Sequence, residues 1–208
     1  MTSGTAVPTG NTYDKYGSTN PVVRRLMAGF ERTLDELFTI AAPDTILDVG
    51  CGEGVLTEQW ADRRSPSPPR RIVGIDLEDP KLAAEWAGRV RPNLTFAAME
   101  VEHLQFADGE FELVAATEVL EHVADPERAL AEMARVASRH LLVSVPHEPL
   151  WRALNMARGA YLRQLGNTPG HLNHWTRRSF VRLLGRYGDV TEVRAPFPWT
   201  MLLVRVRA

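Results

Sequence analysis

A short apolar run that ends in a cluster of glycines is the feature that most restricts how this chain can fold. The run covers residues 45–49, and Gly50, Gly52 and Gly54 follow it directly. A run of this length bounded by glycines is typical of a buried strand. Glycines let the chain turn sharply and let a ligand approach the backbone. The pattern therefore predicts a buried strand followed by a ligand-binding turn.

Strand and helix patterns alternate along the rest of the chain. Helices are expected at residues 21–41, 55–63, 79–90, 118–138 (restarting at 125–126), 148–165 and 176–187. Strands are expected at residues 45–49, 71–76, 94–99, 111–116, 140–145, 190–194 and 200–206. Such alternation predicts an α/β fold, a Rossmann-like, doubly wound, mostly parallel seven-stranded sheet with helices on both faces. Ligands of these sheets bind beyond the carboxyl ends of the strands.

The length of 208 residues suits one domain, and a hydrophobic fraction of 44% supplies its core. Residues 1–12 are expected to be a disordered tail, because they are polar and small. Residues 13–208 then form the single domain. Within it, residues 148–187 are expected to cover the side of the site that receives the second substrate.

Charge and cysteine content restrict the partners and the compartment. The formal net charge is -2 and no basic tract is present, so a nucleic-acid partner is not favoured. Cys51 is the single cysteine, which excludes an intrachain disulfide and favours the reducing cytoplasm. No signal peptide and no apolar stretch of membrane-spanning length is apparent, so no membrane contact is expected. Either a monomer or a homodimer is compatible with these features.

Acidic residues follow three neighbouring strands. Asp48 precedes the glycines, Asp76 ends the second strand and Glu100 follows the third. The glycine spacing Gly-x-Gly-x-Gly differs from the dinucleotide pattern Gly-x-Gly-x-x-Gly. Asp76 could accept hydrogen bonds from both hydroxyls of a ribose. Negative charge beside the glycines suits a ligand with ammonium and sulfonium groups better than a pyrophosphate.

These segments resemble motifs of the class I S-adenosylmethionine-dependent methyltransferases, in the branch that resembles ubiquinone-pathway enzymes. The resemblance covers about residues 44–146. Its segments are Ile46-Leu-Asp-Val-Gly-Cys-Gly-Glu-Gly54, Gly74-Ile-Asp76, Glu100-Val-Glu-His-Leu-Gln-Phe106 and Thr117-Glu-Val-Leu-Glu-His-Val-Ala-Asp-Pro126. The chain departs from the family where Glu100 replaces the commoner aspartate and where a Pro-Gly-Gly turn is missing before residue 140.

The resemblance implies that S-adenosylmethionine is the cofactor and S-adenosylhomocysteine the product. Asp76 would bind the ribose and Leu77 would pack on the adenine, while Glu100 and Val101 would recognise the adenine edge. The other implied cofactor-binding residues are Tyr16, Asp48, Gly50, Cys51, Gly52 and Thr117. The implied activity is methyl transfer to a small molecule, most readily to an oxygen.

Methyl transfer from a sulfonium is an in-line displacement, so a base is needed only when the acceptor must lose a proton. His147 follows the fifth strand and His171 precedes the last helix, which makes them the expected catalytic residues. The cover contains apolar residues together with Arg152, Arg158 and Arg163, which would suit an apolar or aromatic acceptor with negative charge. Residues 197–199 could add to the acceptor pocket.

Two alternatives remain open. Glu118, Glu121 and His122 would share one face of a helix, and His171 or His174 could complete a divalent metal site. This arrangement resembles that of ubiquinone-pathway O-methyltransferases and of small-RNA 3′-terminal 2′-O-methyltransferases. It would imply metal-assisted methylation of vicinal hydroxyls. The second alternative is a non-catalytic protein that binds the cofactor.

Overall fold

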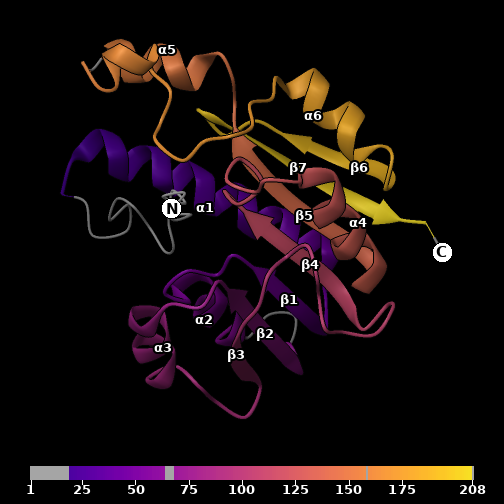
Figure 1. Ribbon diagram of the computed structural model, residues 1–208. Coiled ribbons are helices and arrows are strands. Elements are labelled where there is room, and N and C mark those ends of the chain that lie inside the picture. Colours follow the sequence, from indigo (N-terminus) through magenta and orange to yellow (C-terminus); the bar gives the residue numbers. More distant parts are fainter. Residues whose placement is uncertain (1–18, 64–67, 158, 208) are drawn as a thin grey trace, which may run out of the picture.

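One sheet forms the centre of the protein (Figure 1). The computed structural model describes residues 19–63, 68–157 and 159–207, and within them seven strands pair in the order β3-β2-β1-β4-β5-β7-β6. The strands are β1 (Thr45–Val49), β2 (Arg71–Asp76), β3 (Leu94–Ala98), β4 (Phe111–Thr117), β5 (Ala137–Pro146), β6 (Gly188–Arg194) and β7 (Trp199–Val206). Strands β1 to β5 are parallel, and β7 is antiparallel to both of its neighbours. The order reverses between β1 and β4, which is where such sheets bind ligands.

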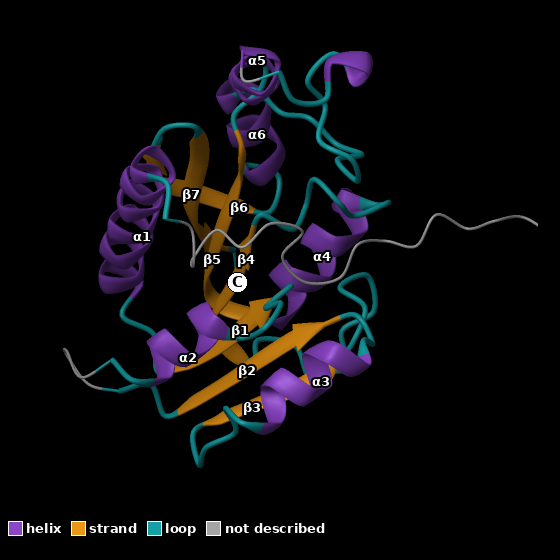
Figure 2. Ribbon diagram, turned by 90° about the vertical axis from the view of Figure 1, so that its left-hand side faces the viewer, coloured by secondary structure: helices purple, strands orange, loops and turns teal. Residues whose placement is uncertain are grey.

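Helices cover both faces of the sheet (Figure 2). The described helices are α1 (Pro21–Ala41), α2 (Val55–Ala61), α3 (Pro80–Ala87), α4 (Pro126–Val136), α5 (Leu150–Ala157) and α6 (Arg177–Leu184). Helices α1 and α2 pack in one apolar cluster, and α4 and α6 pack in the cluster on the opposite face. The predicted fold class is therefore confirmed. Within the described residues, no helix is both long enough and apolar enough to span a membrane.

Local sequence explains where several helices begin. Asn20, Asp79 and Asp125 each precede a proline, and each side chain accepts a hydrogen bond from a backbone amide in the first turn. Such caps satisfy amides that have no partner inside the helix, and proline fits the first helical position. The start of α1, α3 and α4 is thus determined by two adjacent residues.

The helix expected from Glu118 is wrong. Residues 118–124 form turns instead, and Glu118 adopts a left-handed conformation with φ of 61°. The backbone carbonyls of Leu120 and Val123 accept hydrogen bonds from the Asn173 side chain, and the Glu121 carbonyl accepts from the Leu172 and Asn173 amides. Tertiary hydrogen bonds thus replace those that a helix would make.

The helix expected over residues 148–165 is also shorter than predicted. Helix α5 ends at Ala157, and a 3-10 turn follows at Leu162–Gln164. Gly159 has φ of 74°, and Tyr161 and Leu165 also have positive φ. Left-handed residues at these positions interrupt the helical hydrogen bonds, so the apolar spacing alone overestimated the helix.

Candidate cofactor-binding pocket

The turn after β1 is fixed by hydrogen bonds from neighbouring elements. The Cys51 amide donates to the Ile75 carbonyl of β2 at 3.0 Å. The Gly52 amide donates to Asp76 Oδ2 at 2.7 Å, and its carbonyl accepts from Trp86 Nε1 of α3 at 2.8 Å. Asp76 Oδ1 accepts from the Leu77 amide at 2.8 Å. One carboxylate therefore joins the first turn to the end of β2.

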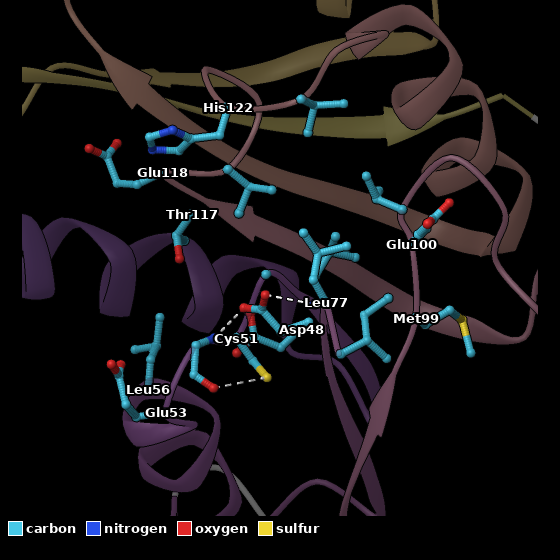
Figure 3. Close-up of a pocket in the computed structure, with 18 of the residues that line it drawn as sticks. Asp48, Cys51, Glu53, Leu56, Leu77, Met99, Glu100, Thr117, Glu118 and His122 are labelled. Atoms are coloured by element: carbon cyan, nitrogen blue, oxygen red, sulfur yellow. Dashed lines mark hydrogen bonds between the residues drawn. The ribbon is translucent and has the colours of Figure 1, made fainter. Parts of the chain in front are cut away.

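A pocket of about 410 Å³ opens above this turn (Figure 3). It runs along the carboxyl edge of the sheet, from the end of β3 across β2, β1 and β4 to the start of β7. Nine of the predicted cofactor residues line it: Asp48, Gly50, Cys51, Gly52, Asp76, Leu77, Glu100, Val101 and Thr117. The structure thus gathers residues that are up to 69 positions apart, as the order of the strands requires. Tyr16 lies outside the described residues.

Charge in the pocket is strongly one-sided. Six of the described lining residues are acidic: Asp48, Glu53, Asp76, Glu100, Glu102 and Glu118. No lysine or arginine occurs among these lining residues. Burial, together with the carboxylates of Asp48 and Asp76, raises the pKa of the Cys51 thiol, so Cys51 stays protonated and is no nucleophile. The electrostatic field of the acidic lining residues favours a cationic ligand and disfavours a pyrophosphate.

Asp48 is a buried carboxylate that the protein alone does not fully satisfy. Thr57 Oγ1 donates to Asp48 Oδ2 at 2.6 Å, whereas Oδ1 has no hydrogen-bond partner among the described residues. Burial raises the pKa of Asp48 to about 7, and the nearby Asp76 adds to the rise. An unsatisfied acceptor at a side-chain-free turn fits a cofactor that brings hydrogen-bond donors and positive charge. The residues present therefore fit S-adenosylmethionine.

Asp48→Asn is expected to flatten the pH dependence of folding. The pKa of Asp48 is higher in the folded chain than its ordinary value of 3.8. Deprotonation of Asp48 therefore costs more free energy in the folded chain than in the unfolded chain. The stabilisation that the protonated carboxyl provides is lost as pH rises from about 4 to about 7. Where the folded chain binds one proton more than the unfolded chain, the free energy of unfolding falls by about 1.4 kcal/mol for each pH unit of increase. Urea unfolding of both proteins between pH 5 and 8 measures the slopes; equal slopes would contradict the assignment.

His147 follows β5 and His171 precedes α6, as predicted, but the pocket is lined by a different histidine. Neither His147 nor His171 is among the described residues that line the pocket, whereas His122 is. The His147 amide bonds to the Pro198 carbonyl, and His171 is buried beside Trp151. His122 Nδ1 lies 3.0 Å from the Gly170 carbonyl oxygen. The prediction that His147 and His171 are catalytic thus gains no support from their position.

Sequence reasoning missed two of the residues at one end of the pocket, Met27 and Phe30. Met27 and Phe30 of α1 line it together with Trp199 of β7. Met27 and Phe30 lie on the buried face of α1, and Trp199 falls within residues 197–199, the segment that the sequence suggested for the acceptor pocket. Their approach to the pocket depends on how α1 packs across the sheet, and no spacing in the sequence encodes that packing.

The mostly parallel sheet, the glycine turn and the acidic strand ends are the features of a class I S-adenosylmethionine-dependent methyltransferase domain. Comparison with known families agrees, because residues 47–140 match the family described as "methyltransferase domain". The matched segment, residues 47–140, is thus similar to a methyltransferase domain, and S-adenosylmethionine is the cofactor of that class of domain.

Two curated proteins and one solved structure illustrate the similarity. The chain is 37% identical over 127 residues to a malonyl-[acyl-carrier protein] O-methyltransferase of Geobacter sulfurreducens, covering 60% of this chain and 44% of that protein. It is 31% identical over 160 residues to a ubiquinone biosynthesis O-methyltransferase of Methylococcus capsulatus, covering 68% and 65%. A magnesium protoporphyrin IX methyltransferase from Synechocystis, solved with S-adenosylhomocysteine, superimposes with a TM-score of 0.63 at 18% identity over 92% of this chain and 90% of that one.

The matches leave parts of these relatives uncovered. The chain spans about half the length of the curated relatives that it matches, 44% and 65% of the two proteins named above. The solved structure has low sequence identity and shares the fold alone.

Proposed function

We propose that this domain transfers the methyl group of S-adenosylmethionine to a small-molecule acceptor, most readily to an oxygen. The observation that carries the proposal is the single continuous pocket from the end of β3 to the start of β7. Its lining extends from the end of β3 to the start of β7, and we propose that the cofactor and the acceptor lie side by side along it. The names of both O-methyltransferase relatives support oxygen as the acceptor atom.

The cofactor residues have distinct proposed roles. Each Asp76 oxygen accepts one backbone amide and keeps a second lone pair with which to accept a ribose hydroxyl. Leu77 and Val101 offer apolar surface to the adenine, and Glu100 offers an acceptor for its amino group. Backbone groups of the turn at 50–52 and Asp48 would face the amino-acid part of the cofactor. Thr117 lies at the end of β4, on the route to the acceptor.

Catalysis by this chain is proposed to consist mainly of positioning. When bound, the cofactor would supply a methyl group on a cationic sulfur, the sulfur would leave as a neutral thioether, and the proton of the acceptor hydroxyl would pass to a base or to solvent. The rigid turn, tied to β2 and α3, fixes one reactant, and the wall formed by α1 and β7 can fix the other. Holding two reactants in line can supply much of a rate enhancement. The acidic lining stabilises the cationic cofactor and excludes anions.

Calorimetry with S-adenosylhomocysteine tests the cofactor site. Incubation with methyl-labelled cofactor and a cell extract, followed by identification of the labelled product, tests the activity. We expect micromolar binding and a labelled small molecule. Absence of binding would reject the site. Binding without transfer, across extracts and acceptor panels, would favour the non-catalytic alternative.

The compartment and assembly of the protein also remain proposals. A single cysteine supports a reducing compartment, so we propose a cytoplasmic protein. We propose one domain over residues 13–208, with 148–187 on the acceptor side, acting as a monomer or homodimer without nucleic acid.

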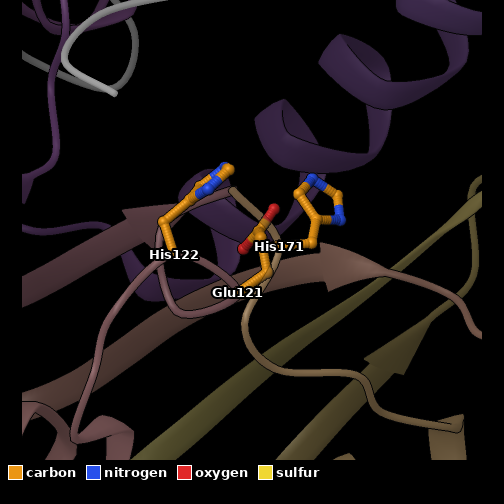
Figure 4. Close-up of side chains that lie close together, drawn as sticks. All are labelled: Glu121, His122 and His171. Atoms are coloured by element: carbon orange, nitrogen blue, oxygen red, sulfur yellow. The ribbon is translucent and has the colours of Figure 1, made fainter. Parts of the chain in front are cut away.

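A metal-assisted reaction is a second candidate, favoured by one cluster of side chains (Figure 4). One potential ligand atom from each of Glu121, His122 and His171 lies within 4.8 Å of the others. Carboxylate and imidazole ligands suit a divalent transition metal. Glu118 is not part of this cluster, because its carboxylate bonds to Ser144 and Trp199 instead. The fourth ligand that the sequence suggested is therefore directed elsewhere.

If the metal is needed, EDTA treatment and Glu121→Gln should each lower methyl transfer at least about 100-fold, while S-adenosylhomocysteine binding stays unchanged. Added Mg²⁺, Mn²⁺ or Zn²⁺ should restore the activity of the EDTA-treated wild type but not that of Glu121→Gln. Full activity after both treatments would exclude this candidate and leave the metal-free reaction. Glu36→Gln, an exposed change on α1, serves as the control.

A further inference from the structure

The pocket extends beyond the predicted cofactor residues to an apolar wall. We define the acceptor wall as Met27, Phe30 and Trp199, which are all buried and line the same pocket. Trp199 pairs with Pro146 at the carboxyl end of β5, so it stands at the same edge as the glycine turn. In strand order, the residues around the end of β3 lie at one end of the pocket and the acceptor wall lies at the other.

Contacts on several sides hold the acceptor wall in place. The rings of Phe30 and Trp199 meet edge to face with centroids 5.0 Å apart, and the Trp151 ring lies 6.0 Å from that of Trp199. Trp199 Nε1 donates to Glu118 Oε2 at 2.7 Å, and Ser144 Oγ donates to Glu118 Oε1 at 3.3 Å. A fixed flat surface of this kind suits a flat or apolar molecule.

The same contacts leave the acceptor wall with few hydrogen-bond donors or positive charges that could bind an anion. The indole N–H of Trp199, a donor that an acceptor anion could use, is already donated to Glu118. Glu118 itself brings a negative charge to this end of the pocket, and the described lining has no lysine or arginine. Arg152 of the cover does not line the pocket either, because its Nε donates to the Leu165 carbonyl. An anionic acceptor would therefore meet repulsion without compensation.

We infer that the acceptor wall binds a neutral or cationic molecule with an aromatic or flat apolar part and rejects an anion of the same shape. Glu118 is the residue that positions Trp199 and selects for charge. The inference rests on the proposed function, because it concerns the second substrate of that reaction. It replaces the anionic acceptor that the arginines at 152, 158 and 163 suggested from the sequence.

Three matched phenols test the charge preference: 4-ethylphenol is neutral, tyramine is cationic and 4-hydroxyphenylacetate is anionic. Binding of each is measured by ligand-observed NMR titration at saturating S-adenosylhomocysteine. We expect 4-ethylphenol and tyramine to bind at least about 10-fold more tightly than the anion, a difference of about 1.4 kcal/mol. Equal or tighter binding of the anion would overturn the inference. Failure of all three to bind would overturn it too, because the wall is inferred to hold a bare aromatic ring.

Two variants separate the contribution of the acceptor wall to binding from the contribution of the Glu118 charge. Trp199→Leu should abolish binding of all three phenols, with S-adenosylhomocysteine binding retained. Glu118→Gln keeps an oxygen for the Trp199 N–H and removes the charge, so it should reduce the discrimination against the anion to less than about threefold. The exposed Glu36→Gln should leave the discrimination unchanged. Unchanged discrimination in Glu118→Gln would contradict the role of this residue. If S-adenosylhomocysteine itself fails to bind the wild type, the proposed function fails instead.

Discussion

Asp76→Asn is expected to weaken S-adenosylhomocysteine binding at least about 100-fold. The carboxylate accepts the Gly52 amide at 2.7 Å and the Leu77 amide at 2.8 Å. An asparagine turns an NH₂ group toward one of these donors, which removes a charge-assisted bond worth about 1.5–3 kcal/mol and displaces the turn. It also removes an acceptor proposed for the ribose. Calorimetry measures the dissociation constant.

Folding should survive this change. Burial raises the pKa of Asp76 above its ordinary value, so the ionised side chain is costly in the folded state and its neutral replacement relieves that cost. Thermal unfolding of Asp76→Asn provides the check. Glu78→Gln is a matched control, since Glu78 is exposed, lies two positions away and is not among the described pocket residues. Binding within a factor of three of wild type in Asp76→Asn would refute its central place in the site.

Gly50→Ala is expected to destabilise the fold by about 2–5 kcal/mol and to impair cofactor binding. Gly50 has φ of 67°, a conformation that costs about 1–2 kcal/mol for an L-residue. A Cβ at this position would also lie 2.4 Å from Val119 Cγ2, and overpacking of this kind costs about 1–3 kcal/mol. Urea unfolding measures the loss.

The two contributions can be separated. Gly50→Ala combined with Val119→Ala removes the collision and leaves the backbone cost, so the double variant should be less destabilised than the sum of the single changes. Gly29→Ala is the control: nothing lies within 4 Å of its added Cβ, and alanine within α1 should stabilise by about 0.5–1 kcal/mol. Equal effects of Gly50→Ala and Gly29→Ala would show that the turn tolerates a side chain.

Much of the fold could be predicted from local patterns. The residue ranges of α1, β1 and β2 agree with the predicted ranges, because each is marked by periodic or continuous apolar residues and by clear boundaries such as Asn20-Pro21 and the glycines from residue 50. The prediction failed where distant residues decide the backbone. At residues 118–124, Asn173 supplies hydrogen bonds that a helix would otherwise make internally.

The candidate site divides in the same way. The amino-acid sequence by itself determined the cofactor half, because parallel strands bring their carboxyl ends to one edge and thereby bring Asp48, Asp76 and Glu100 together. The sequence suggested residues 197–199 for the acceptor half, but only the tertiary structure decided which residues of α1 meet Trp199 there. Met27 and Trp199 are 172 positions apart, and they share a pocket only because α1 packs across the sheet beside β7. Non-directional apolar packing sets that arrangement, so no sequence motif predicts that Met27 and Trp199 share a pocket.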